Sequence, residues 1–486
     1  MGCTYLFFLG LGLLVLFHGC FAQLEQIEQQ QDEYQFLGLR GAQQQPQHRL
    51  RARTDCQIQK LNALEPNRQL EAEAGLTEIW DQNNDELECA GVAAIRYTIQ
   101  PRGLLLPSYT NAPQLFYVIR GRGQQGTAIP GCPESFESTS SSSESGDEER
   151  QRRRDRHQKV RAIREGDVIA LPAGVTHWAY NDGEIPLVCI SLLDVGNDAN
   201  QLDLNFRKFF LAGNPQRQQQ SLSRQEPRRG QEDAGNVFDG IDEDTLAEVF
   251  KIDRETARNL QGRDDQRGNI VQAERDIEVI SPQYQGEERE RQKERSANTV
   301  NTICTLRLRE NIGRSTRADV YNPRGGRIST LNGQDLPILN AIRLSAERGF
   351  LYQNAIMAPH WNVNAHSIIY IIRGSGRIQV AGNVGRSMFD GQVQEGQLIV
   401  IPQNFALIKK AGSQGLEWIA FKTNDNAITS PLAGRLSAIR SMPEEVLMNS
   451  YDISREEARN LKFNREELTV FGPGSRSQRA NKEKKA

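Results

Sequence analysis

The chain contains two copies of one unit, and this internal repeat limits its possible folds more than any other feature. Three stretches recur in the same order: LFYVIRGRG (115–123) and IIYIIRGSG (368–376), REGDVIALPAG (164–174) and QEGQLIVIPQN (394–404), and FKIDRETARNLQ (250–261) and YDISREEARNLK (451–462). Three collinear matches indicate a tandem duplication. A length of 486 residues is also too great for one ordinary domain.

The spacing between the copies shortens along the chain. Equivalent residues lie 253 positions apart at Gly121, 230 apart at Gly166 and 201 apart at Asp253, so the first copy holds 23 and then 29 extra residues. We place these inserts at about 133–158 and 213–236. Both are low in complexity, as is the run at 283–298, and such composition is typical of solvated, disordered segments. The Arg cluster within the first insert adjoins acidic residues and lacks aromatics, which favours a solvated loop over a nucleic-acid site.

Between the inserts, each copy consists of short apolar runs broken by Gly, Asn and Pro. This pattern is typical of a β-sandwich or β-barrel. A helical segment follows each barrel: Asp253 is placed to cap one helix, and Ser454 with Glu457 forms a capping box in the second copy, where Pro443 marks a helix start. The first segment is expected to place three apolar side chains on one face, Leu246, Val249 and Phe250. An apolar helix pair that projects from a barrel predicts docking between subunits.

The N-terminus has the features of a secretory signal. Leu6–Phe17 form a short apolar run, small residues follow, and cleavage is predicted between Ala22 and Gln23, so that 1–22 are removed. Twelve apolar residues are too few to span a bilayer, and no later segment is apolar enough. We therefore expect no membrane association after signal removal.

Charge is unevenly divided between the two halves. The net charge of −3 gives no case for nucleic-acid binding. Residues 299–486, however, carry 25 Lys and Arg against 16 Asp and Glu, a net charge of +9, which leaves −12 for the remainder. An acidic half is thus joined to a basic half.

Five cysteines remain after signal removal: Cys56, Cys89, Cys132, Cys189 and Cys304. In an oxidising compartment, an odd number suggests two bridges and one free thiol. Cys189 lies in PLVCISLL, a buried-strand pattern, and is the expected free thiol. Spacing alone does not pair the other four.

The stretch REGDVIALPAGVTHWAYN (164–181) resembles the second metal motif of a cupin, which carries one histidine ligand. Metal-binding cupins have the form G-x5-H-x-H-x3,4-E-x6-G and then G-x5-P-x-G-x2-H-x3-N. Counting back from Gly121 and Gly374 places the four ligand positions at Pro107, Tyr109, Gln114 and His177 in the first copy, and at His360, Asn362, Ser367 and Leu407 in the second.

Each copy keeps one ligand in four, and one neutral imidazole cannot hold a divalent ion tightly. His366 is present but out of register. We therefore interpret His177 and His360 as packed or hydrogen-bonded residues and expect no metal. The chain also lacks a Gly-x-Ser-x-Gly elbow, a Cys-x-x-Cys pair and a phosphate loop, so no catalytic or cofactor-binding residues are predicted.

At this point the chain is identified as similar to the legumin-type (11S) seed storage globulins of the bicupin superfamily. The resemblance is carried by CQIQKLNALEPNRQLEAEAG (56–75), GCPESF (131–136), NTICTLRLRENIGRSTRADVYNPRGGRISTLN (301–332) and PHWNVNAHSIIYIIRGSGRIQV (359–380). It implies a mainly β fold of two tandem cupin (jelly-roll) barrels, at about 50–265 and 305–470, each followed by a small helical extension.

The resemblance also implies two bridges, Cys56–Cys89 and Cys132–Cys304. Family members are cut once by an asparaginyl endopeptidase, which here would separate an acidic chain (23–298) from a basic chain (299–486) at Asn298–Thr299. The stretch SANTVNTIC departs from the family pattern because it lacks the usual Gly and acidic pair, and Asn301 is an alternative. The implied function is storage of nitrogen, carbon and sulfur in the seed's protein storage vacuole, as a homotrimer and then, after the cut, a hexamer.

Two other functions are compatible with a bicupin. One is a metal-dependent cupin enzyme, which would hold one transition metal per barrel. The other is a sugar- or hormone-binding bicupin, which would hold a stoichiometric ligand.

Overall fold

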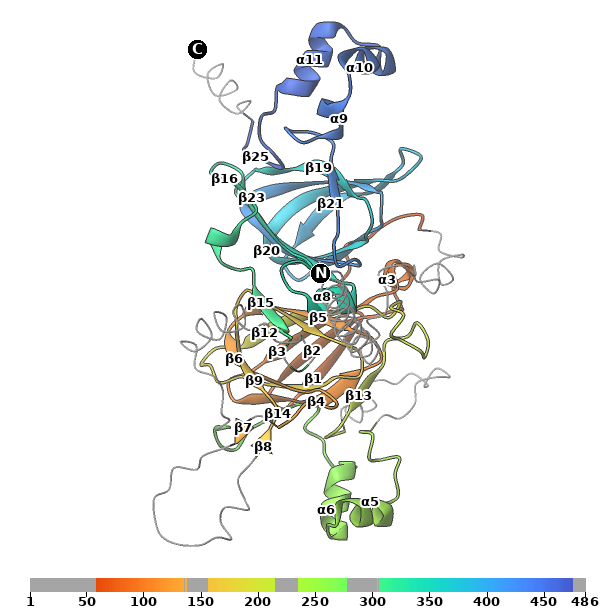
Figure 1. Cartoon of the computed structure of the whole chain (residues 1–486), viewed down its shortest axis with the longest axis vertical. Coiled ribbons are helices and arrows are strands. Elements are labelled where there is room, and N and C mark those ends of the chain that lie inside the picture. The colour runs from red at the N-terminus through yellow and green to blue at the C-terminus, as the bar shows by residue number, and fades with distance from the viewer. Residues whose placement is uncertain are drawn as a thin grey trace, which may run out of the picture.

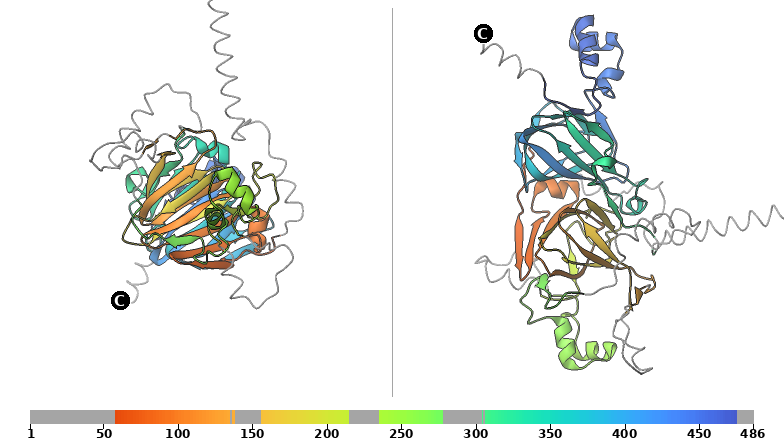
Figure 2. Two further views of the ribbon diagram at one scale, coloured as in Figure 1. Left: turned by 90° about the horizontal axis from the view of Figure 1, so that it is seen from below. Right: turned by 90° about the vertical axis from the view of Figure 1, so that its left-hand side faces the viewer.

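The computed structural model describes residues 58–134, 136–137, 156–214, 235–277, 304 and 306–474. The predicted signal cleavage at Ala22–Gln23, the cysteine Cys56, the processing site Asn298–Thr299 and most of the three low-complexity runs lie outside these residues. Two β-barrels are stacked along the long axis, and a helix pair extends from each end (Figures 1 and 2). The predicted class, mainly β with two barrels and two helical extensions, is confirmed.

The first barrel is formed by two antiparallel sheets. One has the strand order β1 (Arg68–Ala72), β2 (Gly75–Trp80), β3 (Ala93–Ile99), β12 (Leu187–Leu193), β5 (Gln114–Arg120), β10 (Asp167–Leu171) and β15 (Arg309–Asn311). The other has the order β13 (Lys208–Phe210), β4 (Gly103–Thr110), β11 (Thr176–Tyr180), β6 (Arg122–Ala128) and β9 (Val160–Arg164), with β14 (Ile270–Gln272) also paired to β4. β15 comes from the second half of the chain.

The second barrel repeats this arrangement with longer strands. Its strands are β16 (Val320–Asn322), β17 (Gly326–Leu331), β18 (Ser345–Leu351), β19 (Ile356–Asn362), β20 (Ser367–Ala381), β21 (Ser387–Gln394), β22 (Leu398–Ile401), β23 (Ala406–Lys422), β24 (Thr429–Pro431) and β25 (Val470–Phe471). β20 pairs with β21, β22 and β23, so this one long strand takes the positions that β5 and β6 occupy in the first barrel.

Two repeated glycines hold equivalent places in the two barrels, Gly121 between β5 and β6 and Gly374 within β20. Gly121 and Gly374 take positive φ angles of 86° and 82°. A Cβ atom would lie 2.7 Å from the Pro186 oxygen at the first position and 2.3 Å from the Gly415 oxygen at the second. Only glycine fits such a backbone at such close contact, so this repeat marks the same special backbone position in both barrels.

The helical extensions begin where the sequence predicts. α5 (Glu243–Phe250) and α6 (Arg254–Gln261) follow the first barrel, and α10 (Glu444–Tyr451) and α11 (Arg455–Phe463) follow the second. Asp253 caps α6, and Ser454 and Glu457 form the capping box of α11. Of the three apolar residues predicted on one face of α5, Leu246 is buried, while Val249 and Phe250 are exposed.

The shorter elements lie around the barrels. Helices α3 (Asp85–Ala90) and α8 (Ile338–Ile342) lie near the junction of the barrels, and α9 (Ala438–Ser441) leads to α10 (Figure 1). The 3₁₀ turn η2 (Ser315–Arg317) follows β15, and the short pair β7 (Phe136–Glu137) and β8 (Arg156–His157) flanks the first insert. No helix in the described ranges is long and apolar enough to cross a membrane.

The hydrophobic core joins the two halves. One cluster fills the first barrel and continues to the junction, where Trp80 of the first half packs edge-on against Tyr370 of the second, with ring centroids 6.1 Å apart. The second cluster fills the second barrel and includes Leu61 from the first half. The barrels therefore form one packed body.

Candidate functional site

Strand register locates the four former ligand positions in the first barrel and corrects two of them. β4 pairs with β11 and β13 in the first barrel, as β19 pairs with β23 and β24 in the second. Aligning these pairs makes Ser108 equivalent to His360 and Thr110 equivalent to Asn362. The predicted residues Pro107 and Tyr109 are each one place away from these positions. Counting from the glycine failed because the loop after β4 (111–113) is one residue shorter than the loop after β19 (363–366). Tyr109 instead stacks on Phe209, with ring centroids 5.0 Å apart.

The first barrel offers neutral groups at these positions. Ser108 and Thr110 are buried, and Gln114 Nε2 donates to Thr110 Oγ1 at 2.7 Å. His177 packs edge-on against Phe116, with ring centroids 5.4 Å apart. Burial, helped by the charge of Lys208, lowers the pKa of His177 to about 3, so its imidazole is neutral at physiological pH. Two hydroxyls, one amide and one imidazole are a poor ligand set for a divalent metal.

In the second barrel, an ammonium group lies between two former ligand positions. Lys422 Nζ donates to Asn362 Oδ1 at 3.0 Å and to Ser367 Oγ at 2.9 Å. It also lies 3.7 Å from Glu347 Oε2. The residues are all buried. The ammonium group of Lys422 therefore binds the side-chain oxygens at two of the four positions where a metal-binding cupin has its ligands.

Glu347 is the centre of this buried ion cluster. Lys409 Nζ lies 3.8 Å from its Oε1 and 4.6 Å from the centre of the Trp418 ring, and Trp418 Nε1 donates to the same oxygen at 3.1 Å. Burial alone would raise the pKa of Glu347, but the charges of Lys422 and Lys409 outweigh it and lower this pKa to about 2. Burial also lowers the pKa of Lys409 to about 8. This cluster is not among the residues predicted from the sequence, although a lysine in the apolar run EWIAFKTN is a visible signal of it.

His360 is held by the backbone. Its Nδ1 donates to the Ala358 carbonyl at 2.7 Å, and burial together with the charge of Lys409 lowers its pKa to about 3. His366 lies outside the barrel interior, where its Nδ1 accepts from the Gln403 amide at 3.1 Å. Across the described ranges, no three His, Cys, Asp or Glu side chains are grouped so that they could hold a metal ion.

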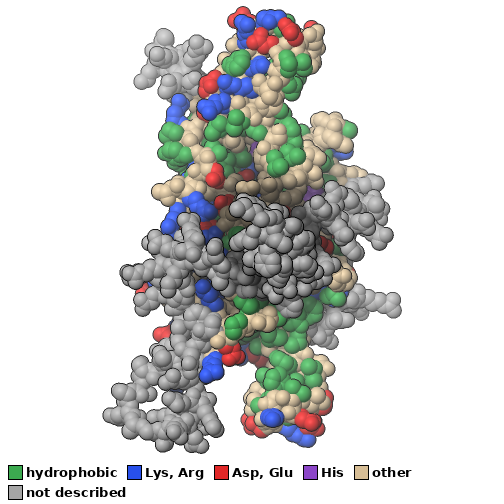
Figure 3. All heavy atoms as spheres, in the orientation of Figure 1, with side chains coloured by type: hydrophobic (Ala, Val, Ile, Leu, Met, Phe, Trp, Pro, Cys, Tyr) green, Lys and Arg blue, Asp and Glu red, His purple; other side chains and the backbone are tan. Residues whose placement is uncertain are grey.

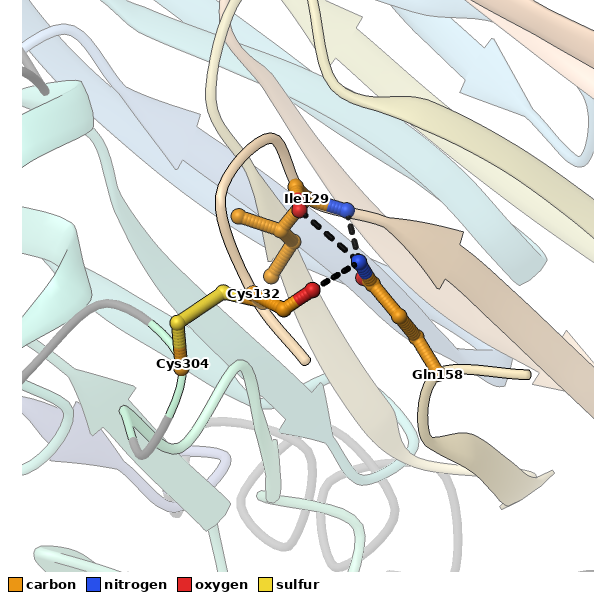
Figure 4. Close-up of a disulfide and its surroundings, with 4 residues drawn as sticks. All are labelled: Ile129, Cys132, Gln158 and Cys304. Carbon is orange, nitrogen blue, oxygen red and sulfur yellow. Dashed lines mark hydrogen bonds between the residues drawn. A yellow bond between two sulfur atoms is a disulfide. The ribbon is translucent and has the colours of Figure 1, made fainter. Parts of the chain in front are cut away.

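The disulfide between Cys132 and Cys304 joins the two halves near the surface. A turn between β6 and β7 carries Cys132, and the Gln158 side chain holds this turn. Gln158 Nε2 donates to the Ile129 and Cys132 carbonyls, each at 2.9 Å, and its Oε1 accepts from the Ile129 amide at 2.7 Å (Figure 4). The two Cα atoms lie 5.3 Å apart. One amide side chain therefore fixes the half of the bridge that comes from the first barrel.

The other cysteines differ in accessibility and bonding. Cys89, in α3, is disulfide-bonded, while its predicted partner Cys56 lies outside the described residues. Cys189 is free and buried in β12, and burial raises the pKa of its thiol to about 12. Such a thiol stays protonated and unreactive at physiological pH.

Two surface features complete the candidate sites. A cleft of about 490 Å³ is lined by Glu86 and Cys89 on one side and by His366, Asn383 and Phe405 on the other. The helix pairs carry exposed apolar side chains at both ends of the molecule (Figure 3). These are Val249 (69% exposed) and Phe250 (49%) in the first pair, and Val446, Tyr451, Leu461 and Phe463 in the second.

Comparison with known proteins agrees with this geometry. Residues 61–217 and 310–459 match the family model described as Cupin. The 11S globulin seed storage protein 1 of Carya illinoinensis is 49% identical over 98% of this chain and 97% of its own length. The crystal structure of pumpkin seed globulin covers 86% of this chain and 100% of its own, with 51% identity and a TM-score of 0.76. An 11S globulin from Wrightia tinctoria, described as revealing an auxin binding site, covers 86% and 96% with 43% identity and a TM-score of 0.75.

Two cupin barrels in one chain define the class, a bicupin. Identity close to one half over nearly the full length then decides the family. The chain belongs to the 11S globulin seed storage proteins. It is a storage protein of the seed, and its relatives are a non-enzymatic family.

Proposed function

We propose that this storage globulin is made as a proprotein and cut once, at Asn298–Thr299, into an acidic chain (23–298) and a basic chain (299–486). The observation that carries this proposal is the Cys132–Cys304 bridge, because it links residues on either side of the cut. The charges of −12 and +9 on the two sides further support the division.

Electrophoresis of seed-extracted protein, with and without reductant, tests the cut. We expect one band near full mature size that splits on reduction into pieces of about 276 and 188 residues. N-terminal sequencing of the smaller piece distinguishes Asn298, which gives Thr299 first, from Asn301, which gives Thr302 first. A single band that survives reduction would contradict the processing proposal.

We propose further that the helix pairs join subunits into a homotrimer, and that cut trimers stack as hexamers. Exposed Val249 and Phe250 at one end, and Tyr451 and Phe463 at the other, support docking of one subunit's first pair on the next subunit's second pair. Light scattering after size exclusion tests this. Phe250→Ser should yield monomers, whereas Val384→Ser, at an exposed turn away from the helices, should remain trimeric. Trimers in both variants would contradict the assignment.

The proposed route is secretion, signal cleavage between Ala22 and Gln23, and deposition in the protein storage vacuole. The two disulfide-bonded sites in the described residues support an oxidising route. Sequencing of the acidic chain should give a terminus at Gln23, and immunogold labelling should locate the protein in protein bodies. A retained apolar leader would contradict this route.

A hormone-binding role is a second candidate, because the Wrightia tinctoria relative is described with an auxin binding site. The cleft of about 490 Å³ beside Cys89 is large enough for a small aromatic acid. Calorimetric titration with auxin tests it. Asn383→Trp should fill the cleft and abolish binding, while Val384→Trp, on the next residue outward, should not. Absence of heat with the unaltered protein would reject this candidate.

A further inference from the structure

We propose that residues 306–313 of the second half form a non-covalent clasp on the first barrel, which keeps the two halves together after the chain is cut and the Cys132–Cys304 bridge is reduced. The clasp rests on the proposed processing only for its biological setting. It lies on the C-terminal side of Asn298, Asn301 and Cys304, so neither the cut nor reduction touches its residues.

The backbone of the clasp continues a sheet of the first barrel. β15 pairs antiparallel with β10, with Asp167 opposite Asn311 and Ile169 opposite Arg309. Two further bonds extend the ladder, from the Ala170 amide to the Leu308 carbonyl at 2.8 Å and from the Ile312 amide to the Gly166 carbonyl at 2.9 Å. Without the clasp, β10 would become an exposed sheet edge with unpaired amide and carbonyl groups.

The side chains of the clasp are held at a buried carboxylate. Asp167 is fully buried and accepts from Arg309 Nη1 at 2.7 Å and from Asn311 Nδ2 at 2.8 Å. Leu308 and Ile312, on either side, are buried in the core of the first barrel. Loss of the clasp would take from Asp167 the Arg309 and Asn311 side chains that now pair with it, which opposes separation of the halves.

The first half makes a reciprocal but weaker contact with the second barrel. Leu61 enters its core, and Leu64 exchanges two backbone hydrogen bonds with Leu398 at 2.7 and 3.0 Å. Here Gln397 stands at the place of Asp167, and its amide donates to Glu65 Oε1 at 2.9 Å in an exposed contact. Each half therefore completes the barrel of the other, and the stronger link is at Asp167.

The test uses the full chain with a recombinant protease site inserted within 278–303, cut, then reduced and alkylated without denaturant. Native mass spectrometry should show the halves still paired one to one. Hydrogen exchange should show the amides of Ala170 and Ile312 still protected. Because the inserted site replaces the natural cut, failure of Asn298 processing in seeds would not affect this result.

Single-residue variants test whether the Asp167–Arg309 contact holds the clasp on the first barrel. Asp167→Asn, and independently Arg309→Gln, should speed exchange at Ala170 and Ile312 at least about tenfold in the cut, reduced protein and lower the urea concentration at which the halves separate. Asp390→Asn, which breaks the exposed ion pair with Arg377, is the matched control and should change neither. Separation of the unaltered halves on reduction alone would overturn the proposal. So would exchange in both clasp variants equal to that of the control, with circular dichroism of the uncut chains confirming that they fold.

Discussion

The two barrels have the same strand arrangement, yet their interiors are filled by different kinds of side chain. In the first barrel three interior positions are apolar, with Ile95, Ala179 and Leu193 all buried. Strand register places Glu347, Lys409 and Lys422 at the equivalent positions of the second. At these three positions one barrel has apolar packing, and the other has an internal ion cluster. The turn glycines survive in both, because the backbone needs them whether or not a metal is bound.

The two barrels also differ in which of two facing strands carries the large side chain. Tyr97 faces Cys189 in the first barrel, and Gly349 faces Trp418 at the equivalent pair in the second. A large residue lies on one strand in each case and a small one on its neighbour, with the order reversed. The total volume is thus maintained while the individual residues exchange size, as close-packed interiors require.

The largest effect is expected when the ion cluster loses its only carboxylate. Glu347→Gln leaves two buried ammonium groups without an opposite charge, and we expect the free energy of unfolding to fall by about 3–5 kcal/mol. Urea unfolding measures the loss. The exposed Glu466→Gln is the control and should have almost no effect.

A transplant sharpens the same comparison. Glu347→Ile, Lys409→Ala and Lys422→Leu together give the second barrel the residues of the first. Replacing a buried ion cluster by apolar groups is often neutral or stabilising by about 1–4 kcal/mol. If the triple variant lost as much stability as Glu347→Gln alone, the apolar residues of the first barrel could not replace the ion cluster of the second.

The next effect concerns the exchanged volumes. A Cβ atom at Gly349 would lie 1.9 Å from Trp418 Cζ2, so Gly349→Ala must displace a fully buried indole. We expect a loss of about 1–3 kcal/mol in urea unfolding. Gly240→Ala has open space around the new Cβ and is the control. Equal stability of the two variants would mean that the indole is not confined.

Acid should destabilise both barrels, and the stability of the second should fall more steeply as the pH decreases. The pKa of His177 and of His360 is lowered from 6.5 to about 3 in the fold. Unfolded imidazoles gain a proton below pH 6.5 and folded ones do not, so each histidine removes up to about 1.4 kcal/mol of stability per pH unit as the pH falls towards 3. Glu347, whose pKa is lowered from 4.5 to about 2, adds a further loss in the second barrel below pH 4.5.

Hydrogen exchange at pH 7, 5.5 and 4 resolves this acid response barrel by barrel. Protection in β20 and β23 should decline more than protection in β3 and β12 once the pH is below 4.5. His177→Gln should flatten the slope of the first barrel alone. A slope unchanged by that variant would show that the buried imidazole does not control acid stability.

Sequence reasoning found what is encoded locally and missed what depends on register between distant strands. The repeated turn glycines, the caps at Asp253 and Ser454 and the buried strand around Cys189 are set by neighbouring residues, and each was predicted. The cluster of Glu347, Lys409 and Lys422 comes from strands that only the fold brings together. The error at Pro107 and Tyr109 arose from one residue of loop length between β4 and β5, which shifts every position on β4 when residues are counted back from Gly121.

The smallest expected difference is between the caps of the two helix pairs. In α11, Ser454 Oγ accepts from the Glu457 amide at 3.2 Å while Glu457 Oε2 accepts from the Ser454 amide at 2.9 Å, so the cap satisfies donors in both directions. In α6, Asp253 only accepts, from the amide and hydroxyl of Thr256.

Ser454→Ala breaks the reciprocal pair and should destabilise its helix by about 0.5–1 kcal/mol. Exchange of the amide hydrogens in 455–458 measures it, with Ser441→Ala, outside the box, as control. Phe463 at the end of α11 is exposed and belongs to the proposed docking surface, so a frayed α11 should also weaken the proposed trimer. Unchanged exchange in Ser454→Ala would mean that the cap does not hold this helix.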